Sequence, residues 1–154
     1  MERVVHGFQP EPLFDVAADV EHYPDFLKWW IAARILKREA NVYFTEQILG
    51  LGPIRFKFIS KTTLYRPERI DVTAEGPPFR RFELSWLFEP IPNAGCRVGV
   101  VAAVALRSSL TERVVGQVLP PALADIVASF EARARSLRSR QRVAYCDHPR
   151  ARNH

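Results

Sequence analysis

The sequence predicts an α+β domain in which a curved antiparallel sheet of six to seven strands wraps around a long C-terminal helix. Two patterns carry this prediction. The middle of the chain alternates apolar and polar residues with the period of half-buried strands, and residues after about 109 follow the spacing of an amphipathic helix. A third pattern, near the N-terminus, predicts two small helices directly after the first strand.

The N-terminal segments begin with "RVVHGF" (residues 3–8), which predicts a short strand. "PEPLFDVAADV" (residues 10–20) then predicts a helix, because Pro12 suits a first turn and the apolar residues recur at helical spacing. Tyr23-Pro24 should end this helix, and a second short helical turn is expected over residues 25–28.

The middle of the chain predicts a meander with one apolar face. "ARILKR" and "VYFTEQIL" flank a hairpin connection, and four further strands follow, separated by the turns "GLGP", "YRPE", "EGPP" and "IPNAG". Alternate residues of the strands share a face. On the last four strands these are Ile54, Phe56 and Phe58; Ile70, Val72 and Ala74; Phe82, Leu84, Trp86 and Phe88; and Val98, Val100, Ala102, Val104 and Leu106.

The C-terminal helix is predicted in two pieces. Ser109 and Glu112 have the spacing of a capping box. Pro120-Pro121 should interrupt the pattern, since proline inside a helix costs about 3 kcal/mol. We therefore expect a short helix over 110–118, a break near Leu119, and a long helix from 121 to about 139. Its apolar stripe is Leu123, Ile126, Val127, Phe130, Ala134 and Leu137.

Length and composition indicate one domain, residues 1–140, followed by a basic and flexible tail, residues 141–154. The chain has 154 residues, 47% of them hydrophobic, and no apolar run long enough to span a membrane. No signal peptide is evident, and Cys96 and Cys146 lack metal-ligand spacing. We expect a reducing, cytoplasmic location, with peripheral association at the inner membrane as an extension of it.

The positive charge is concentrated at the C-terminal end. The net charge is +5, yet the residues after Glu131 carry seven arginines and one acid, which leaves residues 1–131 at −1. Such an arm is attracted to phosphate on lipid or RNA. A solvated helix end with a frayed tail explains the same composition.

A hydrophobic cavity is expected between the sheet and the C-terminal helix, since one helix cannot fill a strongly curved sheet. "EHYPDFLKWW" (residues 21–30) would close one end, either as a lid or as simple packing on the sheet edge. Two adjacent indoles are hard to bury together, so one of them should meet an interface. The predicted ligand contacts are Phe26, Leu27, Trp29, Trp30, Phe56, Phe58, Trp86, Phe88, Leu119, Leu123, Val127 and Phe130.

The order of elements resembles the helix-grip fold of the START and polyketide-cyclase superfamily. "DVEHYPDFL", "EGPPFRR" followed by "WLFEP", and "GCRV" are similar to the coenzyme Q-binding family, which also contains the bacterial ribosome-association toxin. The resemblance runs from about Val4 to Arg135. It implies a pocket that holds a polyprenyl quinone in support of respiration, or, in the toxin branch, a regulator that blocks association of ribosomal subunits.

The sequence shows no catalytic or metal-binding constellation, so we expect a non-enzymatic protein with no cofactor, which takes ubiquinone as a ligand. His22 would either meet a quinone carbonyl or lie on the surface. Arg80-Arg81 would form a solvated loop or meet a headgroup. A polyketide-cyclase activity is the third hypothesis, and it needs acid–base groups in the cavity. The nearest candidates are Glu46, Ser60 and Thr62.

The sequence is therefore compatible with three functions. The first is binding or delivery of coenzyme Q, aided by a basic arm at an anionic membrane. The second is a ribosome-directed regulator whose arm meets RNA of the large subunit. The third is the cyclase. The sequence leaves the oligomeric state, the length of the prenyl chain and the choice between Trp29 and Trp30 open.

Overall fold

The fold was analysed in a computed structural model, which describes the backbone of residues 1–51 and 53–146. Side chains are described over the same range except those of residues 51, 54, 114, 115, 118, 119 and 144–146.

One antiparallel sheet of seven strands forms the body of the molecule, in the order β1-β7-β6-β5-β4-β3-β2. The strands are β1 (Glu2–His6), β2 (Trp30–Glu39), β3 (Val42–Leu51), β4 (Ile54–Tyr65), β5 (Arg69–Ala74), β6 (Phe79–Ile91) and β7 (Gly95–Leu106). Strands β2 to β7 form the predicted meander. The first strand adds to its far edge, where Val5 pairs with Cys96.

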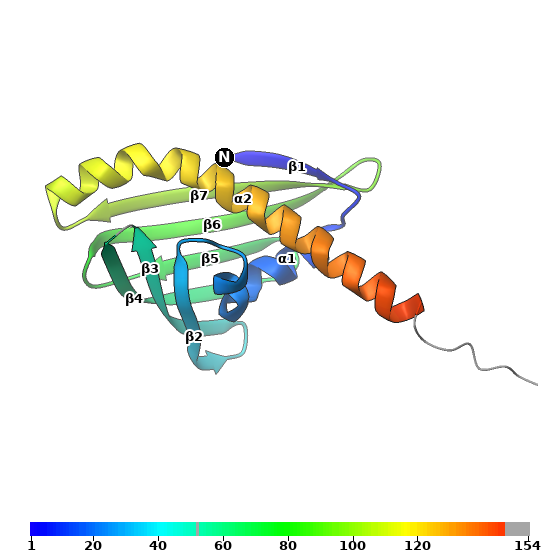
Figure 1. Ribbon diagram of the computed structural model, residues 1–154, viewed down its shortest axis with the longest axis horizontal. Helices are drawn as coiled ribbons and strands as arrows, with labels where there is room; N and C mark the ends of the chain where they lie inside the picture. The colour runs from blue at the N-terminus through cyan, green and yellow to red at the C-terminus, as the bar shows by residue number, and fades with distance from the viewer. Residues whose placement is uncertain (52, 147–154) are drawn as a thin grey trace, which may run out of the picture.

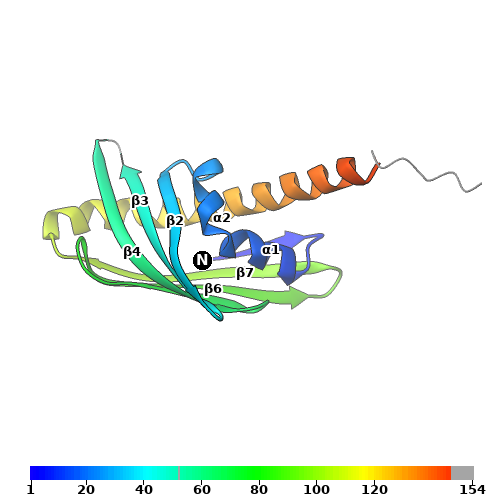
Figure 2. The ribbon, with the colours of Figure 1, turned by 90° about the horizontal axis from the view of Figure 1, so that it is seen from below.

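The sheet is strongly curved, and the C-terminal helix lies along its open side. Figure 2 shows β2, β3 and β4 rising from β6 and β7 toward α2 (Ser109–Cys146). Figure 1 shows α2 crossing the sheet at an angle and its C-terminal end projecting beyond the strands. This arrangement is the helix grip that the resemblance implied, so the predicted fold class is confirmed.

Two small helices follow β1, as predicted, but the second lies elsewhere. The first is α1 (Pro10–Ala18), and the second is a 3-10 helix, η1 (Val20–Asp25), where a turn over residues 25–28 was expected. Pro24 lies inside η1, whereas it was expected to end the first helix and precede the second turn. A short 3-10 turn tolerates this proline because it demands few backbone N–H donors.

The predicted break near Leu119 is absent, because α2 is one continuous helix with Pro120 and Pro121 inside it. Each proline removes one helical hydrogen bond, to the carbonyls of Gly116 and Gln117. All four of these residues are exposed, so water can satisfy both carbonyls. The helix also runs past the expected end at about Ser139. Residues 147–154 of the predicted flexible tail lie outside the described residues.

The second half of α2 is tied to the N-terminal strand by arginines. Arg3 donates to Glu131 at 2.7 Å, Arg135 donates to the carbonyl oxygen of His6 at 3.3 Å, and Arg138 donates to that of Gly7 at 2.6 Å. The guanidinium of Arg138 also lies 4.0 Å from the centre of the Phe8 ring. Some of the predicted basic arm is therefore used to dock the helix.

Candidate functional site

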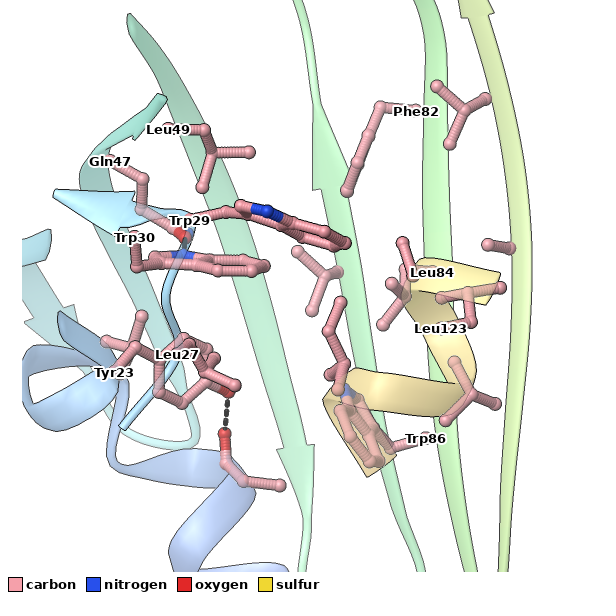
Figure 3. A pocket seen from close by; sticks show the side chains of 18 of the residues that line it. Tyr23, Leu27, Trp29, Trp30, Gln47, Leu49, Phe82, Leu84, Trp86 and Leu123 are labelled. Atoms are coloured by element: carbon pink, nitrogen blue, oxygen red, sulfur yellow. Dashed lines mark hydrogen bonds between the residues drawn. The ribbon is translucent and has the colours of Figure 1, made fainter. Parts of the chain in front are cut away.

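A cavity of about 200 Å³ lies between the concave face of the sheet and α2 (Figure 3). The inner residues of β4 to β7 form its largest wall, because alternate side chains of each strand point to the same face. Those that line the cavity are Phe56, Phe58 and Thr62; Ile70 and Val72; Phe79, Phe82, Leu84 and Trp86; and Val100, Ala102, Val104 and Leu106.

The helix supplies the facing wall. Leu123, Ile126, Val127 and Phe130 follow helical spacing, and together with Ala122 they line the cavity. Val127 and Phe130 are also buried in the core below it, at 2% and 6% exposure. The cavity is thus a gap in an otherwise packed interface between sheet and helix, as the curvature of the sheet led us to expect.

The aromatic segment after α1 closes one end. Tyr23, Leu27, Trp29 and Trp30 all line the cavity, so both tryptophans reach it (Figure 3). The indole of Trp30 donates its N–H to Gln47 Oε1 at 2.8 Å, which satisfies its polar edge. The ammonium of Lys28 lies 5.2 Å from the centre of the Trp29 ring. This segment, called the lid from here on, covers that end of the cavity, with one indole anchored by a hydrogen bond.

A buried polar cluster on β3 and β4 holds this anchor. The amide nitrogen of Gln47 donates to the hydroxyls of Thr45 and Ser60, at 3.0 Å each, and these two hydroxyls lie 2.7 Å apart. Thr45 and Ser60 are 0% and 1% exposed. Both amide hydrogens of Gln47 are consequently engaged inside the protein, and neither remains for a ligand.

Two tyrosines at the same end are held as neutral donors. Tyr43 donates to the carbonyl oxygen of Ala18 at 2.8 Å, and Tyr23 donates to that of Ala17. Burial raises the pKa of Tyr43 to about 12 and raises the pKa of Tyr23 well above its usual value. Neither phenol ionises near neutral pH, so both lend the cavity hydroxyl groups without charge.

Nine predicted ligand contacts line the cavity: Leu27, Trp29, Trp30, Phe56, Phe58, Trp86, Leu123, Val127 and Phe130. Their contact with a ligand remains a prediction, since the cavity lining alone does not identify an occupant. The side chain of Leu119 lies outside the described residues.

Phe26 and Phe88 do not line the cavity, which corrects two predicted positions. Phe26 packs edge-on against Phe130, with ring centres 5.2 Å apart, and Arg133 covers its ring. Phe88 shares the inner face of β6 with Trp86, but β6 extends past the cavity, and there Phe88 meets Phe14 of α1. The alternation was correct for Phe88, but the sequence did not show where along the strand the cavity ends.

The polar residues that the sequence suggested as functional groups lie mostly on the surface. His22 is exposed and pairs with Asp19 at 2.8 Å, and this hydrogen bond raises its pKa. Glu46 lies on the outer face, within 3.5 Å of Arg34 and of Lys57, because Thr45 and Gln47 take the inward positions of β3. Glu46 is therefore excluded as a group inside the cavity.

The other residues considered as functional groups lie in surface ion pairs or in the core. Arg80 and Arg81 are exposed and pair with Glu112 and Glu83. Cys96 is fully buried on β7, and burial raises the pKa of its thiol, which makes it a poor nucleophile. The Cys146 side chain lies outside the described residues.

Sequence reasoning missed the polar side of the cavity. Tyr43, Gln47 and Leu49 of β3 line it, as does Tyr23. The signal was present in "VYFTEQIL", where alternate residues from Tyr43 share one face. The other face carries Val42, Phe44 and Ile48 and is the more apolar of the two, so alternation placed Glu46, rather than Gln47, toward the cavity.

The described residues contain no cluster of three or more His, Cys, Asp or Glu side chains suited to a metal ion. Within the same part of the chain, no helix is both long enough and apolar enough to cross a bilayer.

Residues 7–131 match the family model described as polyketide cyclase / dehydrase and lipid transport. Ribosome association toxin RatA of Pseudomonas aeruginosa is 25% identical over 125 residues, which cover 81% of this chain and 87% of the toxin.

Coenzyme Q-binding protein COQ10 homolog B, mitochondrial, of Xenopus laevis is 24% identical over 147 residues. The match covers 92% of this chain and 60% of that protein. Among solved structures, the 18 kDa protein CC1736 of Caulobacter crescentus has a TM-score of 0.73 and 28% identity, covering 90% of this chain and 96% of its own.

Proposed function

The chain belongs to the polyketide cyclase / dehydrase and lipid transport family, and from this premise we propose that it binds a polyprenyl quinone, coenzyme Q, without chemically changing it. Its START-like fold, with a hydrophobic cavity under the C-terminal helix, is the coarser property on which the proposal builds. Binding or delivery of the quinone would then support respiration.

The composition of the cavity wall is the observation that carries the proposal. Among the described residues that line it, none is charged, and the polar ones are Tyr23, Tyr43, Gln47 and Thr62, with the indoles of the tryptophans. Such a wall favours a ligand that is mostly hydrocarbon with a small polar part. A polyprenyl quinone has this composition.

The size of the cavity fits part of such a ligand. A dry cavity of about 150 Å³ accommodates benzene, so a space of about 200 Å³ accepts a substituted ring. A prenyl chain must continue along the apolar wall and out of the cavity. Each buried CH₂ group contributes roughly 0.8 kcal/mol, so a few isoprene units bind well without any charged contact.

A cyclase-type enzyme is supported less well. Acid–base catalysis needs a group that exchanges a proton near the working pH. Ser60 and Thr62 are hydroxyls, Glu46 lies outside, and both cavity tyrosines remain protonated because burial raises their pKa. These surroundings favour a binding protein over an enzyme.

The relatives favour one further candidate, a regulator directed at the ribosome. Ribosome association toxin RatA matches over most of both chains. In this alternative the surface of the protein carries the activity, through its basic C-terminal arm. The cavity would then have no direct part in binding the large ribosomal subunit.

The proposal is tested with the purified full-length chain. We expect organic extracts to contain a polyprenyl quinone by mass spectrometry, and calorimetry to show binding of a ubiquinone with two isoprene units. Val127→Trp should reduce this affinity at least tenfold, because the new ring fills the cavity. Val101→Trp is the matched control, since Val101 is 62% exposed on the outer face of β7.

The same variants separate the two candidates. If quinone binding carries the function, Val127→Trp abolishes it and Val101→Trp does not. If the ribosome is the target, Val127→Trp should co-sediment with large ribosomal subunits as well as the native protein does. Absence of quinone from extracts, together with no binding by calorimetry, would rule out the quinone proposal.

A further inference from the structure

The indole N–H of Trp86 has no hydrogen-bond acceptor among the described residues, although the side chain is only 5% exposed. Indole has a single polar group, a donor, and it normally finds a partner when it is buried. Trp30 follows this rule through Gln47. Trp86 departs from it in the middle of the candidate site.

The free N–H faces the cavity rather than protein. Every fully enclosed side-chain nitrogen and oxygen of the described residues has a partner, so a donor without one must touch open space. The open space beside Trp86 is mainly the cavity that it lines. Figure 3 shows the nitrogen on the edge of the ring nearer to Trp30, across the cavity.

The Trp86 ring is fixed in this orientation by its neighbours. Phe130 packs edge-on against it with ring centres 4.6 Å apart, and Phe88 stacks nearly parallel at 6.1 Å. The cross-strand partners Ile70 and Val100 are each 1% exposed. A donor held by packing need not be reoriented when a ligand arrives, which favours tight and specific binding.

We propose that the Trp86 N–H donates a hydrogen bond to a carbonyl oxygen of the bound ligand and selects ligands that carry one. The inference rests on the proposed function and deepens it, since the favoured ligand class becomes planar conjugated carbonyl compounds. The opposite wall provides no equivalent donor in Gln47, because both hydrogens of its amide are engaged. A carbonyl at Trp86 is therefore a polar requirement that Gln47 does not duplicate.

The surroundings of Trp86 also set the direction of the ligand. Toward Phe88 only a space of about 10 Å³ remains, between the sheet, α1 and α2. In the other direction Leu84 and Phe82 follow on the same face of β6, and both line the large cavity. A carbonyl at Trp86 therefore places the hydrocarbon part of the ligand along β6 toward Phe82.

The direct test follows the indole protons by NMR in ¹⁵N-labelled full-length protein, which has three tryptophans. The probes are 2,3-dimethyl-1,4-naphthoquinone and 2,3-dimethylnaphthalene, which share ring shape and differ in the carbonyls. We expect the quinone to move the Trp86 indole proton downfield and the hydrocarbon to leave it without that shift. The Trp30 proton, already bonded to Gln47, should respond similarly to both probes.

A substitution test measures the same bond as a ratio. Trp86→Phe should lower affinity for the quinone about three- to tenfold more than for the hydrocarbon, the range expected for one net hydrogen bond. Trp30→Phe is the matched control, because its N–H is engaged in the protein. It should weaken both probes by the same factor.

Two results would overturn this inference while leaving the proposed function intact. One is a Trp86 proton that does not respond when the native protein is saturated with quinone, a measurement that needs no variant to fold. The other is a Trp86→Phe variant that loses both probes equally. If the native protein binds no quinone at all, the proposed function fails and this inference fails with it.

Discussion

Gln47 connects the sheet to the lid. Its amide accepts from Trp30 and donates to Thr45 and Ser60, so four side chains on three strands form one closed network. Buried polar groups that are fully satisfied rigidify a core, whereas an unpaired one costs about 1–3 kcal/mol. The polar side chains in this part of the cavity wall therefore hold Trp30, and with it the lid, in position.

Glu131 is the residue for which a pH dependence follows. Burial opposes its ionisation, but hydrogen bonds from Arg135 and Arg3 outweigh it, and the pKa of its carboxyl is lowered. A carboxyl whose pKa is lowered by folding adds stability above its unfolded pKa, about 4.3, and loses it as the pH falls through the folded value. Glu131→Gln should therefore destabilise the protein by about 1 kcal/mol at neutral pH.

Urea denaturation of the native and Glu131→Gln proteins measures this difference. It should be constant between about pH 6 and 8 and shrink below about pH 4. Glu83→Gln is the control, because Glu83 and Arg81 form an exposed pair that solvent screens. A Glu131→Gln difference that persists unchanged at about pH 3 would contradict the assignment.

The helix α2 has two halves with different support. From Ala122 onward its apolar stripe is buried against the sheet, with Ala122, Val127, Phe130 and Ala134 all below 7% exposure. The first half includes Leu110, which is 76% exposed, and Pro120-Pro121 separates the halves. Local stability follows buried contacts and intact hydrogen bonds, so the first half should open more readily.

Hydrogen exchange measures this difference. Amides of residues 109–119 should exchange faster than those of residues 122–137. Pro120→Ala combined with Pro121→Ala should slow exchange in the first half, since each substitution restores a donor and improves helix propensity by about 3 kcal/mol. Equal exchange rates in the two halves of the native protein would show that the prolines do not weaken the helix.

The distribution of charge over the whole molecule differs from its distribution along the sequence. Arg135 and Arg138 dock α2 on the N-terminal segment, and Arg133 covers Phe26. Cations also gather on the outer face of β2 and β4, beside the acids Glu39 and Glu46. They are Arg34, Lys37, Arg55, Lys57 and Lys61. The C-terminal arm is therefore not the whole basic surface.

Truncation after Ser139 tests the arm. It removes four arginines and one aspartate but retains the docked Arg135 and Arg138. Basic residues near an anionic leaflet contribute roughly 1 kcal/mol each, so binding to anionic vesicles should weaken at least tenfold if the protein works at a membrane. If it works at the ribosome, co-sedimentation with large ribosomal subunits should weaken instead, and both effects should depend on salt.

The cavity provides the control for this truncation. Quinone affinity should not change, because the residues that line the cavity all precede Ser139. A truncated protein that binds vesicles and ribosomal subunits as well as the full chain does would show that the arm is only a solvated helix end.

The sequence by itself determined the strands, the inward faces of β4 to β7 and the helical stripe from Leu123 to Phe130, because alternation and helical spacing are local properties. It did not determine where the cavity ends, which separates Trp86 from Phe88 on one strand face. It also favoured the wrong face of β3, since Val42, Phe44 and Ile48 on the outer face are more apolar than Tyr43, Thr45 and Gln47 on the inner face. The continuity of α2 through two prolines depends on solvent exposure, and the free N–H of Trp86 depends on neighbours from β5, β7 and α2. Only the tertiary structure decided these, because burial and hydrogen-bond pairing are set by residues distant in the chain.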